Sequence, residues 1–382
     1  MNVERVLIVG AGIGGLGAGA LFGQRGVEVE IVEIKPEAKV YGVGINQPGN
    51  SLRALREIGV LPEILAVGFE FDRWVFHDYH GEVIVSVPSQ LGGDGIPANC
   101  ALSRRALQNI LIAAAEGAGA RIRYGTTIAD LAPNGDGVVV TFDDGREDSY
   151  DLVVGFDGIK SPLRRRLFGD EHRPTYTGYG VWRVTVPRPP EIDYGAVYQS
   201  PWHKAGHIPL SDETMYLFHV TAEPEGAHFD PADFPTLLRA RLEEFEGPVG
   251  VIRDNLRDGD DIVFGPLSEV LLPPPWNRGR VVIGGDATHA CTPHITQGAG
   301  MALEDAVVLV EELSGETDVE TALRSYAERR YPRAKFVQDV SRGILEAEMA
   351  VTTETLPAAI EHMAAELPGQ FAGVDEFLNQ PV

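Results

Sequence analysis

The residue types best suited to chemistry are concentrated in one stretch after position 280. A β-branched run at residues 281–283 has the composition of a buried strand and stops at two glycines and Asp286. A loop containing Pro293 then leads to an apolar periodicity that predicts a helix over residues 298–313. The free N–H groups and positive dipole end of such a helix favour negative charge. The stretch therefore suits a flat ligand that bears a polyol and develops negative charge, and the alternative is a turn whose glycines serve only packing.

A second glycine-rich turn, near the N-terminus, has the spacing of a dinucleotide-binding fingerprint. Gly10-x-Gly12-x-Gly14-Gly15 follows a predicted strand and opens a predicted helix, and Glu33 ends the next predicted strand. Gly10 permits the tight turn, Gly12 lets a pyrophosphate approach the backbone, and Gly15 allows helix and strand to pack closely. Glu33 can accept hydrogen bonds from ribose hydroxyls, so the motif predicts a bound FAD or NAD.

Composition excludes several classes of function. The chain has 382 residues, of which 44% are hydrophobic, enough for two domains or one large α/β unit. The formal net charge of −24 argues against nucleic acid or an anionic membrane as partner, because both need concentrated Lys and Arg. Cys100 and Cys291 have no metal-type spacing, so we expect no metal site and no dithiol centre. No leader or membrane-spanning segment is recognisable, which predicts a cytoplasmic protein.

Three further stretches place polar residues beside predicted elements. Ser103 is suited to cap a helix from residue 102, and Arg104 at its start indicates a nearby phosphate or other anion. An apolar run before Asp157-Gly158 predicts a buried strand. Residues 41–50, which include Asn46, are interpreted as a loop that either lines a ligand or makes a long turn.

Residues 176–270 have a different character. Alternating apolar positions predict strands over residues 181–186 and 215–220, and one helix is expected over residues 234–245. Residues 74–87 show the same alternation. These patterns predict a separate, mostly antiparallel sheet.

Three motifs thus occur in order along the chain: the Gly10 fingerprint with Glu33, Asp157-Gly158 with Arg164, and Gly285-Asp286 with Pro293 and Gln297-Gly298-Ala299-Gly300. Together they resemble the single-component, class A flavoprotein monooxygenases, the aromatic hydroxylases of the para-hydroxybenzoate and salicylate hydroxylase type. The resemblance covers nearly the whole chain.

The resemblance implies an α/β fold in which a Rossmann-like FAD-binding domain of the GR2 type carries an inserted, mostly antiparallel β-sheet substrate domain and ends in C-terminal helices. The FAD-binding parts are expected at residues 1–72, 98–175 and 273–382, the last with the C-terminal helices. The substrate domain is expected at residues 73–97 and 176–272.

The resemblance also implies roles for single residues in holding FAD. The ADP half would be held by Gly10, Gly12, Gly14, Gly15 and Glu33, and the pyrophosphate or ribityl region by Arg104.

Around the flavin ring, Asp286 would take a ribityl hydroxyl, and the backbone at Gly298 and Ala299 would face the pyrimidine edge. Pro293 would lie beside the ring at the oxygen site. Asp157 would be associated with both FAD and the reduced nicotinamide.

The implied reaction uses NADH or NADPH as transient co-substrate and O₂, and hydroxylates a small aromatic molecule through a flavin C4a-hydroperoxide. A histidine is a plausible base for the substrate hydroxyl, and His207 together with Asn46 is our choice. The substrate would be lined by aromatic and histidine side chains of the inserted sheet: Trp74, Trp182, Tyr198, Trp202, His203, His207, Tyr216 and His219. The Pro293-His294 pair is similar to the salicylate and hydroxynicotinate hydroxylase branch, and quinolone hydroxylases share much of this loop.

Two alternatives remain open at this point. One is an FAD-dependent epoxidase or reductase of an isoprenoid or polyketide, and the other is a non-catalytic FAD-binding protein. A monomer or homodimer is expected in each case.

Overall fold

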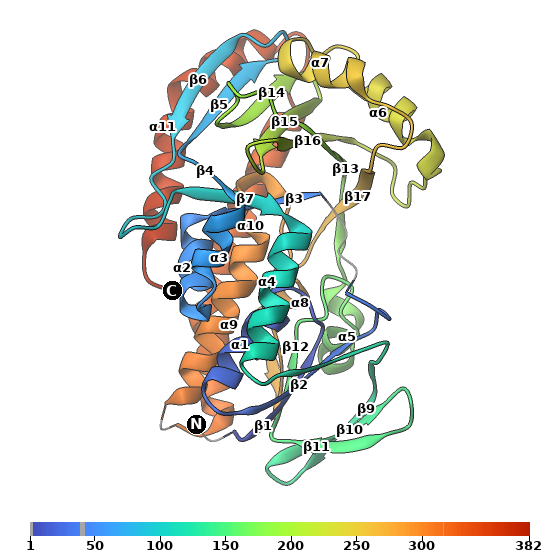
Figure 1. Cartoon of the computed structure of the whole chain (residues 1–382), viewed down its shortest axis with the longest axis vertical. Helices are drawn as coiled ribbons and strands as arrows, with labels where there is room; N and C mark the ends of the chain where they lie inside the picture. The colour runs from blue at the N-terminus through green and yellow to red at the C-terminus, as the bar shows by residue number, and fades with distance from the viewer. Residues whose placement is uncertain (1–2, 39–42, 316) are drawn as a thin grey trace.

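The computed structural model describes residues 3–38, 43–315 and 317–382 as a mixed α/β protein. Figure 1 shows two regions stacked along the long axis: a lower one built on a parallel sheet with helices, and an upper one built on a mostly antiparallel sheet. The C-terminal helices run beside both regions. This is the fold class that the sequence predicted.

The lower region is organised by a six-stranded sheet. Its spatial order is β18 (Asn277–Arg278), β19 (Val281–Ile283), β12 (Leu152–Gly155), β1 (Arg5–Val9), β2 (Glu28–Glu33) and β8 (Arg121–Tyr124). All neighbours pair in parallel except β18 with β19. The apolar runs predicted for β1, β12 and β19 are buried along most of their length, as expected for parallel strands covered on both faces. The parallel arrangement brings the carboxyl ends of these strands to one edge, where Gly10, Asp157 and Gly284 follow.

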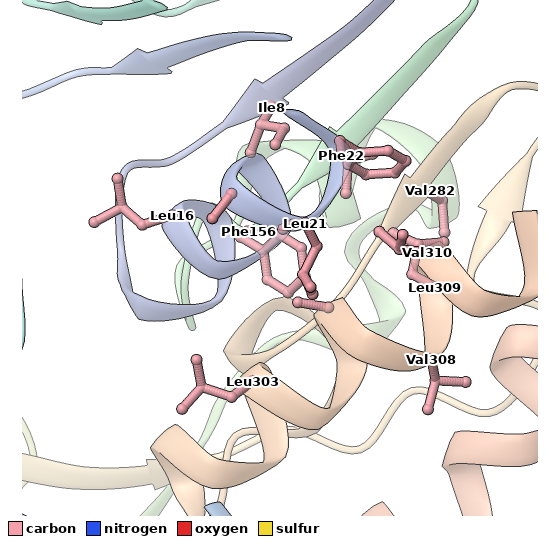
Figure 2. Packing of buried hydrophobic residues seen from close by; sticks show 14 of the residues in the cluster. Ile8, Leu16, Leu21, Phe22, Phe156, Val282, Leu303, Val308, Leu309 and Val310 are labelled. Atoms are coloured by element: carbon pink, nitrogen blue, oxygen red, sulfur yellow. The ribbon is translucent and has the colours of Figure 1, made fainter. Parts of the chain in front are cut away.

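Helices surround this sheet, some packed on its strands and others packed on neighbouring helices. The main ones are α1 (Ile13–Gln24), α2 (Gly49–Ile58), α3 (Leu61–Val67), α4 (Arg104–Gly117), α5 (Pro162–Phe168) and α9 (Gly298–Ser314). Figure 2 shows α1 side chains such as Leu21 and Phe22 among those of α9, with Phe156 between them. A Cβ at Gly17 would come within 3.2 Å of Leu303, so the glycine allows α1 to lie close to α9.

The upper region is organised by a seven-stranded sheet. Its order is β17 (Ile262–Glu269), β13 (Thr175–Pro187), β16 (Thr214–Ala222), β15 (His203–Pro209), β14 (Gly195–Ser200), β5 (Arg73–Asp78) and β6 (Val83–Pro88). Neighbours pair antiparallel except β14 with β5. The outer face packs on side chains of α6 (Phe234–Arg241) and α7 (Gly247–Asn255).

Smaller elements complete the chain. Two three-stranded sheets contain β3 (Gly44–Pro48), β7 (Asn99–Ser103) and β4 (Phe69–Phe71), and β11 (Glu147–Tyr150), β10 (Gly137–Phe142) and β9 (Ile128–Asn134). Short helices are α8 (Asp286–His289), η1 (Asp170–His172), η2 (Pro231–Asp233) and η3 (Pro293–Ile295). The long C-terminal helices are α10 (Val319–Met349) and α11 (Leu356–Asn379). Within the described ranges, no helix is both long and apolar enough to cross a membrane.

One expectation about local structure is wrong. The segment interpreted as a loop forms β3 over Gly44–Pro48, because it pairs antiparallel with β7, a partner far away in the sequence; residues 41 and 42 of that segment lie outside the described residues. The helix that Ser103 is predicted to cap begins at Arg104, directly after β7. Ser103 does cap that helix, accepting a hydrogen bond from the Ala106 N–H at 3.1 Å.

Candidate active site

A cavity of about 1190 Å³ joins the two regions. It begins at the glycine-rich turn between β1 and α1, passes the carboxyl edge of the parallel sheet, and continues between the inner face of the upper sheet and helices α10 and α11. Its volume slightly exceeds the usual range of about 300–1,000 Å³ for one small-molecule site. It can therefore hold a dinucleotide and a second ligand side by side.

The four glycines of the N-terminal fingerprint have different structural roles. Gly10 has a φ of +105°, and a Cβ on it would lie 2.3 Å from the Phe156 carbonyl oxygen. A Cβ on Gly15 would lie 2.0 Å from the Gly10 carbonyl oxygen, and one on Gly14 would meet the Phe156 ring at 2.6 Å. Only Gly12 has an open Cβ direction, with no atom within 4 Å, and it lines the cavity at the N-terminus of α1. Gly12 and Gly14 therefore border the ligand space, whereas Gly10 and Gly15 shape the turn from outside the cavity wall.

Two carboxylates hold this turn and the neighbouring one. Glu33 lines the cavity and accepts hydrogen bonds from the N–H groups of Ala11 and Lys35, both at 3.0 Å. Its remaining lone pairs are free to accept from a ribose. Asp157 lies just outside the cavity lining and accepts from the Leu163 N–H at 3.0 Å, while its Oδ1 is buried without a partner. Burial raises the pKa of Asp157 above its ordinary value.

The Gly285-Asp286 turn presents an unpaired acid to the cavity. The Asp286 side chain lines the cavity, is exposed to it, and makes no hydrogen bond with the described residues. Burial of the surrounding site raises its pKa, and His289 and Arg104 act in the opposite direction. Such an acceptor suits the hydroxyls of a polyol.

The start of α9 supplies donors opposite this acid. The helix has no side-chain cap, and its first N–H to find a backbone partner is that of Met301, which bonds to the Gln297 carbonyl at 2.9 Å. The N–H groups of Gly298 and Ala299 are therefore available to a ligand, and both residues line the cavity. A Cβ at Gly298 would meet nothing within 4 Å.

A buried ionic network fixes the acid and the helix start relative to each other. Asp305 accepts hydrogen bonds from the Gly285 N–H at 2.8 Å and from Arg330 at 2.7 Å, and lies 2.6 Å from His289 Nε2. Burial acts to raise the pKa of Asp305, but His289 and Arg330 outweigh it and hold the pKa at about 2. The adjacent Glu304 pairs with Arg330 and with Arg333 of α10, at 2.9 and 2.8 Å. Sequence reasoning missed this network, although two acids inside the apolar pattern of α9 were a visible signal.

Asn46 and Pro293 both line the cavity. Asn46 donates to Asn99 Oδ1 at 2.8 Å and to Thr296 Oγ1 at 3.2 Å. Its own Oδ1 is buried without a partner, so it can accept from a ligand. Asn46 owes this position to β3, the strand that sequence reasoning took for a loop.

His207 lies away from the cavity, which is a correction to the proposed base. The ring is fully buried, its Nε2 lies 3.2 Å from the Tyr198 hydroxyl, and burial lowers its pKa to about 3. The physical reason is the two-residue period of a strand: on β15, Lys204 and Ile208 face the cavity, so 203, 205 and 207 face the outer core.

The same alternation places the other predicted wall residues that lie on strands, whereas Trp202 lies in the turn between β14 and β15. Trp74 and Tyr216 line the cavity. The remaining members lie outside its lining: Trp182, Tyr198, Trp202, His203 and His219. Trp182, for example, packs in the outer core against Phe229 and Phe264.

Arg183, the next residue of β13 after Trp182, points to the opposite face of the sheet and lines the cavity. It makes no hydrogen bond or ion pair with any residue of the described ranges. Burial lowers its pKa to about 10, with a further contribution from Arg104. Tyr216 lies in the electrostatic range of both cations, and burial raises its pKa, so the hydroxyl stays protonated. Arg183 and Arg104 therefore make this part of the site positive; Asp286 lies in electrostatic range of Arg104, but no anion among the described residues pairs with Arg183.

A second group on the cavity wall is built from an ion pair and a histidine. Lys204 of β15 pairs with Glu348 of α10, and both side chains are almost fully buried. The Nε2 of His294 faces Glu348 Oε2 at 3.6 Å and has no hydrogen-bond partner, while its Nδ1 lies 3.0 Å from Thr292 Oγ1. Burial, together with Lys204, lowers the pKa of His294 well below its ordinary value, so the ring is neutral near pH 7. Lys204 faces the cavity because it pairs in register with Val220 of β16, so neither Lys204 nor Glu348 had a local sequence signal.

The residues along the cavity fit FAD. Gly12 leaves room at a helix N-terminus for a pyrophosphate, Glu33 offers acceptors for a ribose, and Asp286 offers them for a polyol. Gly298 and Ala299 present free N–H groups where a ring would end. Within the described part of the chain, no cluster of His, Cys, Asp and Glu has the arrangement of a metal site.

Comparison with known proteins agrees with this geometry. Residues 4–341 match the family model described as an FAD binding domain. A 2-heptyl-3-hydroxy-4(1H)-quinolone synthase from Pseudomonas aeruginosa is 32% identical and is matched over 88% of this chain and 87% of its own length. A 6-hydroxynicotinate 3-monooxygenase from Bordetella bronchiseptica is 30% identical over 88% of this chain and 90% of its own. The crystal structure of Klebsiella pneumoniae HpxO complexed with FAD and uric acid has the same fold, with a TM-score of 0.88, 24% identity, and coverage of 98% and 96%.

The chain therefore belongs to the FAD-binding family of class A flavoprotein monooxygenases. It is an FAD-dependent oxidoreductase of the monooxygenase type, as the three sequence motifs predicted.

Proposed function

We propose that the protein hydroxylates the ring of a phenolic or N-heteroaromatic small molecule, with O₂ as oxygen donor and NADH or NADPH as transient electron donor. The observation that carries the proposal is the cavity, which joins the FAD-binding turn to a wall with aromatic and cationic side chains. The quinolone and hydroxynicotinate named for two relatives support this substrate class.

FAD, when bound, supplies the redox chemistry by accepting hydride from the nicotinamide and reacting with O₂. Gly12 and Glu33 hold its ADP half, with Gly10, Gly14 and Gly15 shaping the turn. Asp286 binds the ribityl hydroxyls and Arg104 the neighbouring phosphate or ribityl oxygens. The free N–H groups of Gly298 and Ala299 stabilise negative charge at the pyrimidine edge.

Arg183 and Tyr216 bind the oxygen substituent of the substrate ring. A hydroxylated ring is more reactive toward an electrophilic oxygen when its hydroxyl is deprotonated, and an unpaired guanidinium stabilises the resulting oxyanion. The Tyr216 hydroxyl donates a hydrogen bond to the same oxygen, since burial keeps it protonated.

His294 takes the proton from the substrate hydroxyl, in place of His207. Its ring is neutral near pH 7 and its Nε2 is unpartnered at the cavity; burial and Lys204 disfavour the imidazolium that would form, and Glu348 beside that nitrogen offsets this effect. Pro293 and Asn46 position this loop beside the ring.

The inner face of the upper sheet excludes water from the reaction. Val181, Ile208, Phe218 and Val220 line the cavity and contribute an apolar wall. The position of this sheet over the cavity supports the proposed division into FAD-binding parts at 1–72, 98–175 and 273–382 and substrate parts at 73–97 and 176–272.

Anaerobic stopped-flow reduction by NADH and by NADPH, with and without phenolic acids, hydroxypyridines and quinolones, tests the function. We expect one ring class to accelerate flavin reduction by tenfold or more and to incorporate one atom of ¹⁸O₂ on readmission of oxygen. Rapid reduction of the flavin at a rate that no aromatic compound changes would contradict the proposal and favour an isoprenoid reductase or epoxidase.

A cytoplasmic location and a monomeric or homodimeric state are also proposed. Both cysteines are free, as is usual in a reducing compartment. Light scattering on the purified protein measures the oligomeric state directly.

A further inference from the structure

The cavity has an arm that the ring chemistry does not use. Beyond His294 it continues between the upper sheet and the two C-terminal helices, along the side where Figure 1 shows α11 against β6. The arm is defined by apolar cavity-lining residues: Phe76, Val197 and Phe218 of the sheet, Ile344 of α10, and Leu367 and Phe371 of α11. The rings of Phe76 and Phe371 meet edge to face with centroids 5.6 Å apart, so sheet and helix form one continuous apolar surface.

Small residues keep the arm open where bulky ones would fill it. Gly343 lies within α10 and Gly373 within α11, both line the cavity, and a Cβ on either would meet nothing within 4 Å. Glycine inside a helix is less favourable than alanine by about 1 kcal/mol. At these two positions it leaves ligand space between the helices.

The inner end of the arm adjoins polar groups of the ring site. Glu348 follows Ile344 by one helical turn on the same face of α10, and pairs with Lys204. The side chain of His294, with only 1% of its surface exposed, has its unpartnered Nε2 at this junction. A ligand that satisfies these groups with its ring would direct any substituent along the apolar wall.

The charge of α11 also limits the charge that such a substituent can carry. Among the charged residues of α11, Asp375 lines the cavity and Glu361, Glu366 and Glu376 are exposed outside its lining, and the helix has no Lys or Arg. A carboxylate or phosphate at the far end of a substituent would therefore be repelled by this helix. A neutral, apolar chain is the occupant that the wall and its charge both favour.

We propose that the substrate ring carries a neutral alkyl chain and that this chain lies in the arm between α10 and α11. The proposal rests on the proposed ring hydroxylation and narrows it to amphipathic rings, excluding small aromatic acids without a chain. Burial of successive methylenes along the arm then tightens binding by about three- to fourfold each until the arm is full.

A homologous series tests the proposal in the holoenzyme. Dissociation constants for 4-alkylphenols and 2-alkyl-4-quinolones, from methyl to nonyl, are measured by the change in the flavin absorption spectrum without any reductant. Substrate-stimulated NADH or NADPH oxidation is measured in parallel. We expect affinity to rise with chain length in at least one ring series and then level off.

Gly373→Leu and Gly343→Leu place a side chain in the arm without a backbone conflict, because both residues are helical. Each should weaken binding of the longest homologue by tenfold or more and leave the methyl homologue unchanged. Gly369→Leu is the matched control, since it introduces the same side chain on α11 at a position that does not line the cavity. Its dissociation constants should equal those of the parent protein.

The outcomes separate the two proposals. Affinity that is independent of chain length, or a Gly373→Leu variant that weakens short and long homologues equally, overturns the alkyl-chain proposal even where rings stimulate oxidation. If affinity rises with the length of the alkyl chain but no ring is hydroxylated, the alkyl-chain proposal is supported and the proposed reaction is overturned.

Discussion

Arg183 shows how a single side chain can be placed for function at the expense of stability. The guanidinium is partly buried, lines the cavity and lacks a partner among the described residues. A buried charge without a counterion is unfavourable for the folded protein, and the proposed substrate oxyanion would be its missing partner.

We therefore predict opposite effects of Arg183→Leu on stability and binding. The FAD-free variant should be more stable by about 1 kcal/mol in urea unfolding, because an unpaired charge is removed. Its affinity for a ring oxyanion should fall by tenfold or more, as measured by flavin spectral titration. Arg183→Lys, which retains the charge, should recover part of the affinity; equal stability and equal affinity in the leucine variant would refute this role.

Gly12 offers a second prediction at the residue scale. Its φ is −82°, which any residue can adopt, and its Cβ direction points into open cavity space. Gly12→Val should therefore fold normally by circular dichroism but bind FAD at least tenfold more weakly, because the side chain occupies the space for the pyrophosphate. Gly117→Ala, at another helical glycine with an open Cβ direction, should bind FAD as the parent does. Retained flavin content in Gly12→Val would contradict the placement of the pyrophosphate.

The two kinds of site residue differ in how far sequence could predict them. The glycines of the FAD turn are forced by local sterics, so their spacing alone points to a ligand at a helix start. The wall residues depend on which face of each strand looks inward. Histidines and aromatics attract attention in a sequence, but His207 and Trp182 fall on the outer face, whereas Arg183 and Lys204 fall on the inner one.

At the scale of elements, α9 and α10 act as one support for the flavin site. Asp305 and Glu304 of α9 are fully buried and held by Arg330 and Arg333 of α10. Through the Gly285 N–H, Asp305 also fixes the turn that presents Asp286. The network therefore links the second helix of the pair to the acid that faces the cavity.

Asp305→Asn tests this link. Loss of the charge leaves Arg330 and His289 less well compensated, and we expect the free energy of unfolding to fall by about 3 kcal/mol and flavin content to fall with it. Asp339→Asn removes an exposed acid that pairs with Lys335 four residues away on α10, and should change stability by less than about 1 kcal/mol. The free energies of unfolding of the two variants, measured in urea by far-UV circular dichroism, should differ clearly. Equal values would contradict a stabilising role for the network.

Element types were predictable where their signals were local. The strands β1, β2, β12 and β19 and the helices α1 and α9 follow from apolar runs and periodicity, whereas the parallel strand β8 was not predicted. β3 and β7 were not predictable in this way, since each is a strand only because the other pairs with it across more than fifty residues of chain. The ion pairs of α9 with α10 depend likewise on tertiary packing.

For the molecule as a whole, buried neutral histidines set the response to acid. Burial lowers the pKa of His77, His203, His207, His219 and His294. The unfolded chain therefore takes up protons at these rings before the folded protein does. Their effect on stability is absent above an unfolded-state pKa of about 6.5 and becomes increasingly unfavourable as the pH falls below it.

We predict that the free energy of unfolding decreases steeply between pH 6.5 and pH 5. His207, with its pKa of about 3, should account for about 2 kcal/mol at pH 5. His207→Asn should flatten the pH dependence measured by urea unfolding, whereas the exposed His362→Asn should leave it as it is. If the pH dependence of the free energy of unfolding is unchanged in His207→Asn, the pKa of His207 is not lowered by folding and the prediction is wrong.

The two C-terminal helices differ in what they touch, and this bears on how the protein can diversify. α10 carries Arg330 and Arg333 under the flavin site and Ile344 and Glu348 on the substrate wall, so a shift of its axis disturbs both. α11 packs on β6 and α2 and lines only the far part of the cavity, although its last turn also accepts hydrogen bonds from Arg333 at Phe377 and Leu378. Mutations in α11 before this last turn can therefore accumulate without loss of the cofactor. New substrate ranges should arise first by drift in this last helix, and a library built for altered selectivity should randomise α11 while leaving α10 intact.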